Sequence, residues 1–330
     1  MTLLTRRHAG VLLAFSLATG GAFAQGNAYP NRSVKIVVPF SAASTADNVA
    51  RSFTDRLGQR FKQPFVIDNK AGAGGTLGVS AVAHAPADGY TLVLTTSSPL
   101  VINPLIDRTV NYQVEKDLTP VAMIASGGLL LVAHPNLPAN TLPELVALLR
   151  KNPGKYSFAS NGNGSYSHMA MELFKQMAGV DLVHIAYKGP AQAETDVIGG
   201  QVTLMFDSVT TGAEMVKAGR LKAFGISSAQ ADAVAPQFMP IAQQGVAALK
   251  DFDVVGWTGL LAPAGTPPET VATLRAAMRD LIAEPAFRAD MLKRNSALVP
   301  PEKVGDMALQ IRNDRVKWEA LVRAADIRLD

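Results

Sequence analysis

Residues 34–61 read VKIVVPFSAASTADNVARSFTDRLGQRF, and this stretch decides the fold class. The apolar run from Val34 to Pro39 predicts a short buried strand. From Ala46 to Phe61 the apolar residues recur every four positions and predict a helix with one apolar face: Val49, Phe53, Leu57 and Phe61. A strand that leads directly into such a helix is typical of βα units, so we expect an α/β protein.

The same alternation continues along the chain in two sets. Further strands are predicted at 65–68, 90–96, 120–125, 129–134, 156–160, 183–187, 202–206, 221–226 and 254–262. Helices are predicted up to about residue 85, at 143–151, 165–178, 190–198 and 210–218, and from about 268 onward. The second set is inserted between the first set and the C-terminal helices. We therefore expect two lobes, residues 25–124 with 257–330 and residues 125–256, joined by two crossing strands that act as a hinge.

The N-terminal residues 1–24 have the pattern of a secretory signal. Arg6 and Arg7 supply the positive region, a short apolar run follows from Ala9 to Leu17, and Ala24 closes an A-x-A cleavage site. The paired arginines also fit a twin-arginine signal, so both export routes stay open. Because the net charge of +4 includes these two arginines, the mature chain is nearly neutral.

The composition excludes several classes of protein. Hydrophobic residues make up 48% of the chain, which is enough for packed cores. With no cysteine, the chain has no disulfide, thiolate nucleophile or cysteine-based zinc site. Aromatic residues are only 6% and are not interleaved with basic ones, so a nucleic-acid surface is not expected. Motifs for nucleotides, calcium and histidine-bound metals are absent, and no later stretch predicts a membrane span. We therefore expect no cofactor and no membrane embedding.

Two strand–loop–helix junctions carry the candidate chemistry. The first leads through residues 40–45 into the helix that carries Asp47, and the second leads through residues 161–164 into Ser165. A helix N-terminus offers unpaired N–H groups and about half a positive charge. Two such ends facing one cleft would bind a carboxylate without an arginine. The alternative is that the hydroxyl residues at both junctions are ordinary helix caps.

Other residues allow competing interpretations. Ser165, His168 and Asp207 suggest a hydrolase, but the G-x-S-x-G elbow is absent and Ser165 lies only three residues before the histidine on one helix. Trp257 lies at a predicted crossing strand, where it packs in the hinge or lines the cleft. The Gly-rich stretch 72–75 is most simply a tight turn before a helix.

The motifs in order resemble a known family over nearly the whole mature chain. The similarity is carried by Tyr29-Pro30 with VKIVVPF, by IDNKAGAGG (67–75), DGYTL (88–92), ASNGNGSYSH (159–168), HIAYKG (184–189), GGQV (199–202) and WTGLLAP (257–263). Together these blocks resemble the solute receptors of tripartite tricarboxylate transporters, the TctC or Bug (Bordetella uptake gene) family.

The resemblance implies a two-lobed periplasmic-binding-protein fold of the Venus-flytrap type II, with mixed, mainly parallel sheets flanked by helices. It implies a periplasmic, monomeric, non-enzymatic receptor that hands a small carboxylate to a two-component membrane permease. The family's two binding loops map onto the following residues, with three further cleft positions at the end: Phe40, Ser41, Ala42, Ala43, Ser44 and Asp47; Ser160, Gly162, Gly164 and Ser165; Ser97, Tyr187 and Asp207.

One departure from the family pattern concerns the first loop. Ala43 and Ser44 stand where the family has two glycines, so a left-handed backbone there would be costly. Either the loop is built differently, or Ser44 contributes a side-chain hydrogen bond in place of a close backbone approach. The same fold would also suit a sensor subunit docked on a membrane signalling protein, which is the alternative function.

Overall fold

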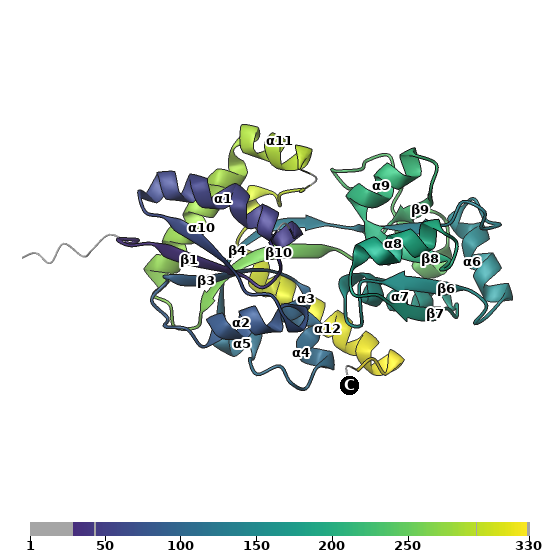
Figure 1. Cartoon of the computed structure of the whole chain (residues 1–330), viewed down its shortest axis with the longest axis horizontal. Helices are drawn as coiled ribbons and strands as arrows, with labels where there is room; N and C mark the ends of the chain where they lie inside the picture. Colours follow the sequence, from purple (N-terminus) through teal and green to yellow (C-terminus); the bar gives the residue numbers. More distant parts are fainter. Residues whose placement is uncertain (1–28, 43, 295, 329–330) are drawn as a thin grey trace, which may run out of the picture.

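The computed structural model describes residues 29–42, 44–294 and 296–328, and it contains two separate five-stranded sheets (Figure 1). Sheet A has the order β2-β1-β3-β10-β4: Phe65–Asn69, Val34–Val38, Thr91–Thr96, Gly256–Pro263 and Leu118–Gly127. Sheet B has the order β7-β6-β8-β5-β9: Val183–Ala186, Ser157–Ser160, Leu204–Ser208, Leu129–Ala133 and Lys222–Ile226. The predicted signal segment and its cleavage site lie outside the described residues.

Both sheets are mixed, as predicted. In sheet A, β1 pairs in parallel with β2 and β3, whereas β10 runs antiparallel between β3 and β4. Sheet B repeats this plan: β6 is parallel to β7 and β8, and β5 is antiparallel to β8 and β9. The strands near the crossings are the antiparallel ones, so the mixture is more even than the βα pattern alone predicts.

Helices cover the faces of both sheets (Figure 1). Those on the sheet A side are α1 Thr45–Phe61, α2 Thr76–Ala83, α3 Ser98–Val101, α4 Asn103–Ile106, α5 Val114–Asp117, α10 Pro268–Ala283 and α11 Pro285–Lys293. Those on the sheet B side are α6 Leu142–Lys151, α7 Tyr166–Ala178, α8 Pro190–Ile198 and α9 Val209–Lys217. On the predicted apolar face of α1, Val49, Phe53 and Leu57 are at most 2% exposed and Phe61 is half-buried. Within the described chain, no helix is long and apolar enough to cross a membrane.

The chain crosses between the sheets at two points that lie side by side. At the first, β4 ends at Gly127 in sheet A and β5 begins at Leu129 in sheet B. At the second, the Val254 N–H donates to Ser227 O beyond the end of β9, and β10 begins two residues later in sheet A.

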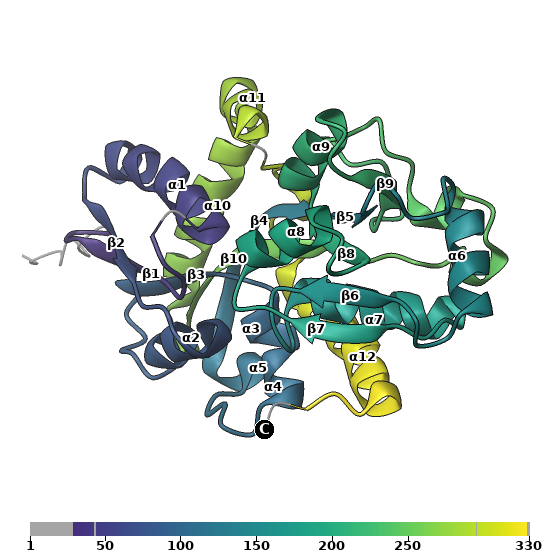
Figure 2. The ribbon, with the colours of Figure 1, turned by 45° about the vertical axis from the view of Figure 1, so that its right-hand side comes forward.

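The last helix, α12 (Met307–Ala325), contacts α3, α4 and β4 on one side and α7 on the other. In Figure 2 it runs, in yellow, from the sheet A side to the sheet B side beneath the crossing strands. Its Trp318 ring packs edge-on against Tyr166 of α7, at a centroid distance of 5.9 Å. The two halves are therefore joined by a third element besides the crossing strands.

Candidate functional site

A cleft of about 570 Å³ lies beside the two crossings, and both halves of the molecule line it. Its floor is formed by the crossing strands, at residues 125–129 and 256–258. The sheet A side contributes residues of α1, the β3–α3 junction and the segment near α11: Asn48, Val49, Ser52, Thr96, Ser97, Ser98, Met291, Arg294, Ser296 and Ala297. The sheet B side contributes the starts of α7 and α9 and a nearby loop: Asn161, Tyr166, Ser208, Val209, Thr210, Thr211, Asp232 and Val234.

The N-terminus of α7 is the second junction predicted from the sequence. Ser165 is its N-cap, and its Oγ accepts a hydrogen bond from the His168 N–H at 3.3 Å. Four backbone N–H groups of the loop also donate to acceptors close by in the sequence. The donors and acceptors are Asn161 to Ser167 Oγ, Gly162 to Ser160 Oγ, Gly164 to His168 Nδ1 and Ser165 to Gly162 O.

Because these N–H groups already donate hydrogen bonds within the protein, other groups of the second loop must contact a ligand. The N–H groups of Asn163, Tyr166 and Ser167 form no hydrogen bond with any of the described residues. Tyr166 and Asn161 line the cleft, whereas the predicted site residues Ser160, Gly162, Gly164 and Ser165 form the frame behind them. The groups available to an anion are therefore those of the first helical turn.

The N-terminus of α9 is a third such end, and the sequence interpretation missed it. Ser208 is the N-cap, and its Oγ accepts from the Thr211 N–H at 3.3 Å. The predicted site residue Asp207 lies just behind, 2% exposed, and accepts from the Ser208 N–H and the Thr211 hydroxyl at 2.7 and 2.8 Å. Burial raises the pKa of Asp207 to about 6, although these hydrogen bonds act in the opposite direction. The sequence does carry the signal, because a strand again leads into a Ser/Thr cap.

The first junction is arranged differently from the prediction. Ser44 is the N-cap of α1 and accepts from the Asp47 N–H at 3.3 Å. The Asp47 carboxylate is 1% exposed and is held by two bonds from Arg51, at 2.8 and 3.1 Å, and one from Asn69 at 2.9 Å. The Asn69 amide also donates to Phe40 O at 3.1 Å, which fixes the start of the loop.

Only a small part of the first junction lines the cleft. Ser41 and Ala42 are exposed and do not line the cleft, and Ala43 lies outside the described residues. The part of α1 that does line the cleft is its second turn, with Asn48, Val49 and Ser52. Ser44 thus caps its own helix, which is the alternative that the sequence left open for the hydroxyl residues at both junctions.

The other predicted positions are divided between the cleft and its surroundings. Ser97 lines the cleft, is 2% exposed, and its N–H donates to Trp257 O across sheet A. Tyr187 does not line the cleft, because its hydroxyl donates to Asp196 at 2.6 Å on the flank of sheet B. Burial raises the pKa of Tyr187 to about 12, and the bond to Asp196 adds to this effect.

Trp257 combines both roles that the sequence left open. The residue lines the cleft, but its indole Nε1 donates to Asp314 Oδ2 of α12 at 2.7 Å and the side chain is 3% exposed. Sequence reasoning missed two charged residues of the lining, Asp232 and Arg294. Asp232 accepts from the Gly128 N–H at the first crossing, and Arg294 is paired with Asp290 at 3.0 Å.

The hydrolase interpretation is not supported by the positions of its residues. His168 Nδ1 accepts the Gly164 N–H at 3.1 Å, so this nitrogen faces the backbone and not the Ser165 hydroxyl. Ser165 Oγ instead lies 3.2 Å from Ser167 Oγ. Since a general base must reach the proton of the nucleophile, this pair lacks the required geometry. The described residues also hold no group of three His, Asp or Glu side chains that could bind a metal ion.

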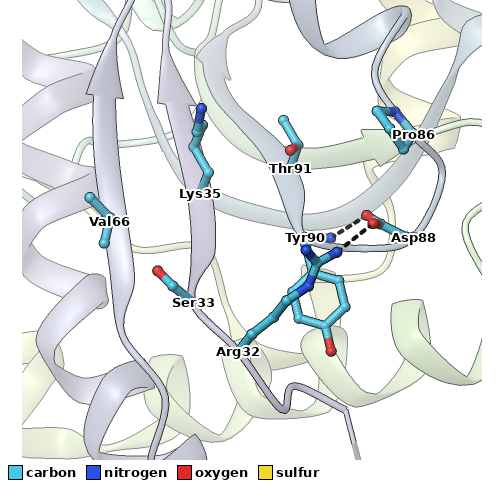
Figure 3. A pocket seen from close by; sticks show the side chains of 8 residues that line it. All are labelled: Arg32, Ser33, Lys35, Val66, Pro86, Asp88, Tyr90 and Thr91. Atoms are coloured by element: carbon cyan, nitrogen blue, oxygen red, sulfur yellow. Dashed lines mark hydrogen bonds and ion pairs between the residues drawn. The ribbon is translucent and has the colours of Figure 1, made fainter.

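A second hollow of about 530 Å³ lies at the opposite edge of sheet A, where β1, β2 and β3 begin (Figure 3). Its cations are already paired: Arg32 contacts Asp88 at 2.8 Å and stacks over Tyr90, and Lys35 lies 3.8 Å from Asp68. Ligands of open α/β sheets bind outside the carboxyl ends of the strands, where the cleft lies. The cleft is therefore the candidate site.

Comparisons with known proteins show which proteins this chain is similar to. Residues 49–327 match the family described as "Tripartite tricarboxylate transporter family receptor". The protein BugT of Bordetella pertussis is 31% identical to this chain over 324 residues, covering 96% of this chain and 97% of BugT.

Solved structures extend the similarity to the fold. Rpa4515 of R. palustris, determined with adipate, has a TM-score of 0.77 and 30% identity, and the match covers 91% of this chain and 99% of that one. MatC from Rhodopseudomonas palustris, with bound malate, has a TM-score of 0.75 and 30% identity, and the match covers 89% of this chain and 100% of MatC. The periplasmic binding protein BugD has a TM-score of 0.74 and 30% identity, and the match covers 91% of this chain and 99% of BugD.

Proposed function

Because the chain belongs to the tripartite tricarboxylate transporter receptor family, we propose that it is a periplasmic receptor that binds a small carboxylate and delivers it to a membrane permease. Two solved relatives were determined with adipate and malate, which are both small dicarboxylates. The ligand of this chain would occupy the cleft between the two sheets.

One observation carries the carboxylate assignment: the N-termini of α7 and α9 both open onto the cleft. The N–H groups of Tyr166 and Ser167 have no acceptor among the described residues, and each helix end carries a partial positive charge. A carboxylate would satisfy these donors. The hydroxyls of Ser97, Ser208 and Thr210, which belong to the same lining, would add neutral donors.

Binding would be coupled to closure of two lobes about the crossings. We place the lobe boundaries near residues 124 and 257, as the sequence predicts, because the chain changes sheets at 127–129 and 254–256. Ligand would favour a closed state through contacts made with both sides at once. We further propose export after removal of residues 1–24, a monomeric state, a two-component permease as partner, and no catalytic activity.

The test is a thermal-shift panel on purified residues 25–330 with mono-, di- and tricarboxylates, acidic amino acids, aromatic acids and neutral analogues. A ligand at 100 times its Kd adds about 2.7 kcal/mol of stability, hence a shift of several degrees. A response confined to one class of acids is expected. A response to the neutral analogues alone would refute the carboxylate assignment.

A matched pair of variants tests the location of the site. Asn161→Asp adds a negative charge to the cleft at the start of α7, so affinity for the responding acid should fall at least tenfold. Asn136→Asp adds the same charge at an exposed position outside the cleft lining and should leave affinity unchanged. Equal affinities for the two variants would place the ligand elsewhere. Delivery to a permease is tested by uptake of the labelled acid in cells with and without this gene.

A further inference from the structure

Two imidazole rings are stacked against the second loop, and neither of them lines the cleft. The rings of His168 in α7 and His184 in β7 are 4.0 Å apart and nearly parallel, with an interplanar angle of 9°. Phe158 of β6 continues the stack at 4.7 Å from His184. His168 is 6% exposed and Phe158 is fully buried, so these two rings belong to the packed interior of the sheet B side, whereas His184 is half-buried.

Each imidazole is bonded to a different end of the loop. His168 Nδ1 accepts the Gly164 N–H at 3.1 Å. His184 Nε2 lies 2.6 Å from Ser160 Oγ, and that hydroxyl in turn lies 3.2 Å from both the N–H and the carbonyl of Gly162. The stack therefore connects the two glycines of the loop through one direct bond and one bond relayed by a serine.

These two glycines are the points where the loop has the most conformational freedom. Gly162 and Gly164 have φ values of +116° and +70°, which few other residues adopt. Glycine gains more backbone entropy on unfolding than any other residue, so a loop with two of them needs anchors to hold one shape. The bonds from the imidazole stack supply an anchor at each glycine.

The protonation states suit this role. Burial, with the charges of His184 and Lys175 adding to it, lowers the pKa of His168 to about 3, and burial lowers the pKa of His184 to about 4. Both rings are therefore neutral at neutral pH. Since His168 Nδ1 accepts an N–H, its proton is on Nε2, which faces Glu172 Oε1 at 3.8 Å.

We propose that His168 and His184 are positioning residues for ligand binding. They hold the loop between Ser160 and Ser165 in the shape that turns the Asn161 side chain and the first-turn N–H groups of α7 toward the cleft. This inference rests on the proposed function, because it assigns a role in that same site. A loop ordered before the ligand arrives costs less entropy on binding, so the stack raises affinity without touching the ligand.

The test compares variants that keep or remove the bonding atoms. His168→Asn retains an acceptor near the Nδ1 position, and His168→Leu removes it while filling similar space. His184→Gln retains a polar group near the Nε2 position, and His184→Phe keeps a stacked ring without one. We expect at least a tenfold loss of affinity for the responding acid with the leucine and phenylalanine variants. The asparagine and glutamine variants should bind within threefold of the wild type.

A matched control is present in the same half of the molecule. His134 Nδ1 also accepts a backbone N–H, from Asn136 at 3.1 Å, but it does not line the cleft or contact the loop. His134→Leu should leave affinity unchanged. If His168→Leu does not fold, Ser160→Ala interrupts the relay to Gly162 and tests the same argument from the other end.

A second measurement separates this inference from the proposed function. Amide hydrogen exchange of Gly162 and Gly164 is measured on ligand-free protein, and we expect exchange at Gly164 to rise at least tenfold in His168→Leu but not in His168→Asn. Should no acid bind the wild type, the proposed function fails while exchange still decides whether the stack orders the loop. The inference is overturned if the leucine and asparagine variants are alike in exchange, or if they bind a responding acid equally well.

Discussion

Gly164→Ala should destabilise the protein through a contact that the sequence does not reveal. A Cβ placed on Gly164 would lie 2.1 Å from Ile106 Cδ1, which belongs to α4 on the sheet A side. The residue also has φ +70°, where any side chain is strained. The main clash therefore lies against the opposite half of the molecule.

The magnitude has two parts. A left-handed backbone costs a non-glycine residue about 1–2 kcal/mol. Overpacking a buried site costs about 1–3 kcal/mol more, and Ile106 is only 3% exposed. We therefore expect Gly164→Ala to lower the free energy of unfolding by about 2–5 kcal/mol. Gly179→Ala measures the first part alone, since Gly179 has φ +62° and no atom within 4 Å of a built Cβ.

Urea unfolding of a double-mutant cycle tests this reasoning. Ile106→Val removes the clashing Cδ1 and by itself costs about 0.5–1.5 kcal/mol, leaving the next atom, Cγ1, at an ordinary 3.5 Å. In that background Gly164→Ala should retain only the backbone penalty, which gives a coupling energy of about 1–3 kcal/mol. Additive effects, within about 0.5 kcal/mol, would refute the contact between the loop and α4.

Three further predictions concern buried polar groups. Because the pKa of Asp207 is raised from 3.8 to about 6 in the folded state, the protein should lose stability as pH rises from about 4 to 6. A pKa difference of about two corresponds to about 3 kcal/mol, so the free energy of unfolding of Asp207→Asn, measured with urea, should not show this decrease with pH. Parallel pH profiles for the variant and the wild type would contradict the prediction. Asp47→Ala should cost about 1–3 kcal/mol of stability, yet calorimetry should find the preference between amino acids and dicarboxylates unchanged, because this carboxylate faces Arg51. Trp257→Phe leaves the Asp314 carboxylate, 4% exposed, without its indole donor, and unfolding should reveal a loss of about 1–3 kcal/mol; wild-type stability would argue against that bond.

Local patterns were sufficient to predict most of the regular elements. The four-residue period of α1 and the apolar run of β1 lie where the sequence places them, because both signals arise within one element. Residues 98–117 gave no prediction, and there the structure has three helices of four residues each. Such helices are too short to display a period, so their positions depend on packing against the rest of the fold.

The site was predicted in part, and the missing part is non-local. The caps Ser44 and Ser165 were visible because a helix cap is a short-range pattern. Asp232 and Arg294 reach the cleft only because separate segments return to the crossings, which no local pattern encodes. The role of Asp47 was also hidden, since its bond to Asn69 joins residues that are 22 positions apart.

In the cleft, backbone N–H groups would bind the carboxylate and side chains would contact the rest of the ligand. This difference explains why the class of ligand is easier to infer than its identity. Helix N-termini present N–H groups that any carboxylate satisfies, and capped helix starts can be recognised from sequence. The body of the ligand would instead meet walls of mixed character, with apolar Val49, Val209, Val234 and Met291 beside hydroxyl groups. Changes in these walls leave the N–H groups in place. One scaffold can thereby serve acids as different as the adipate and malate found with its relatives.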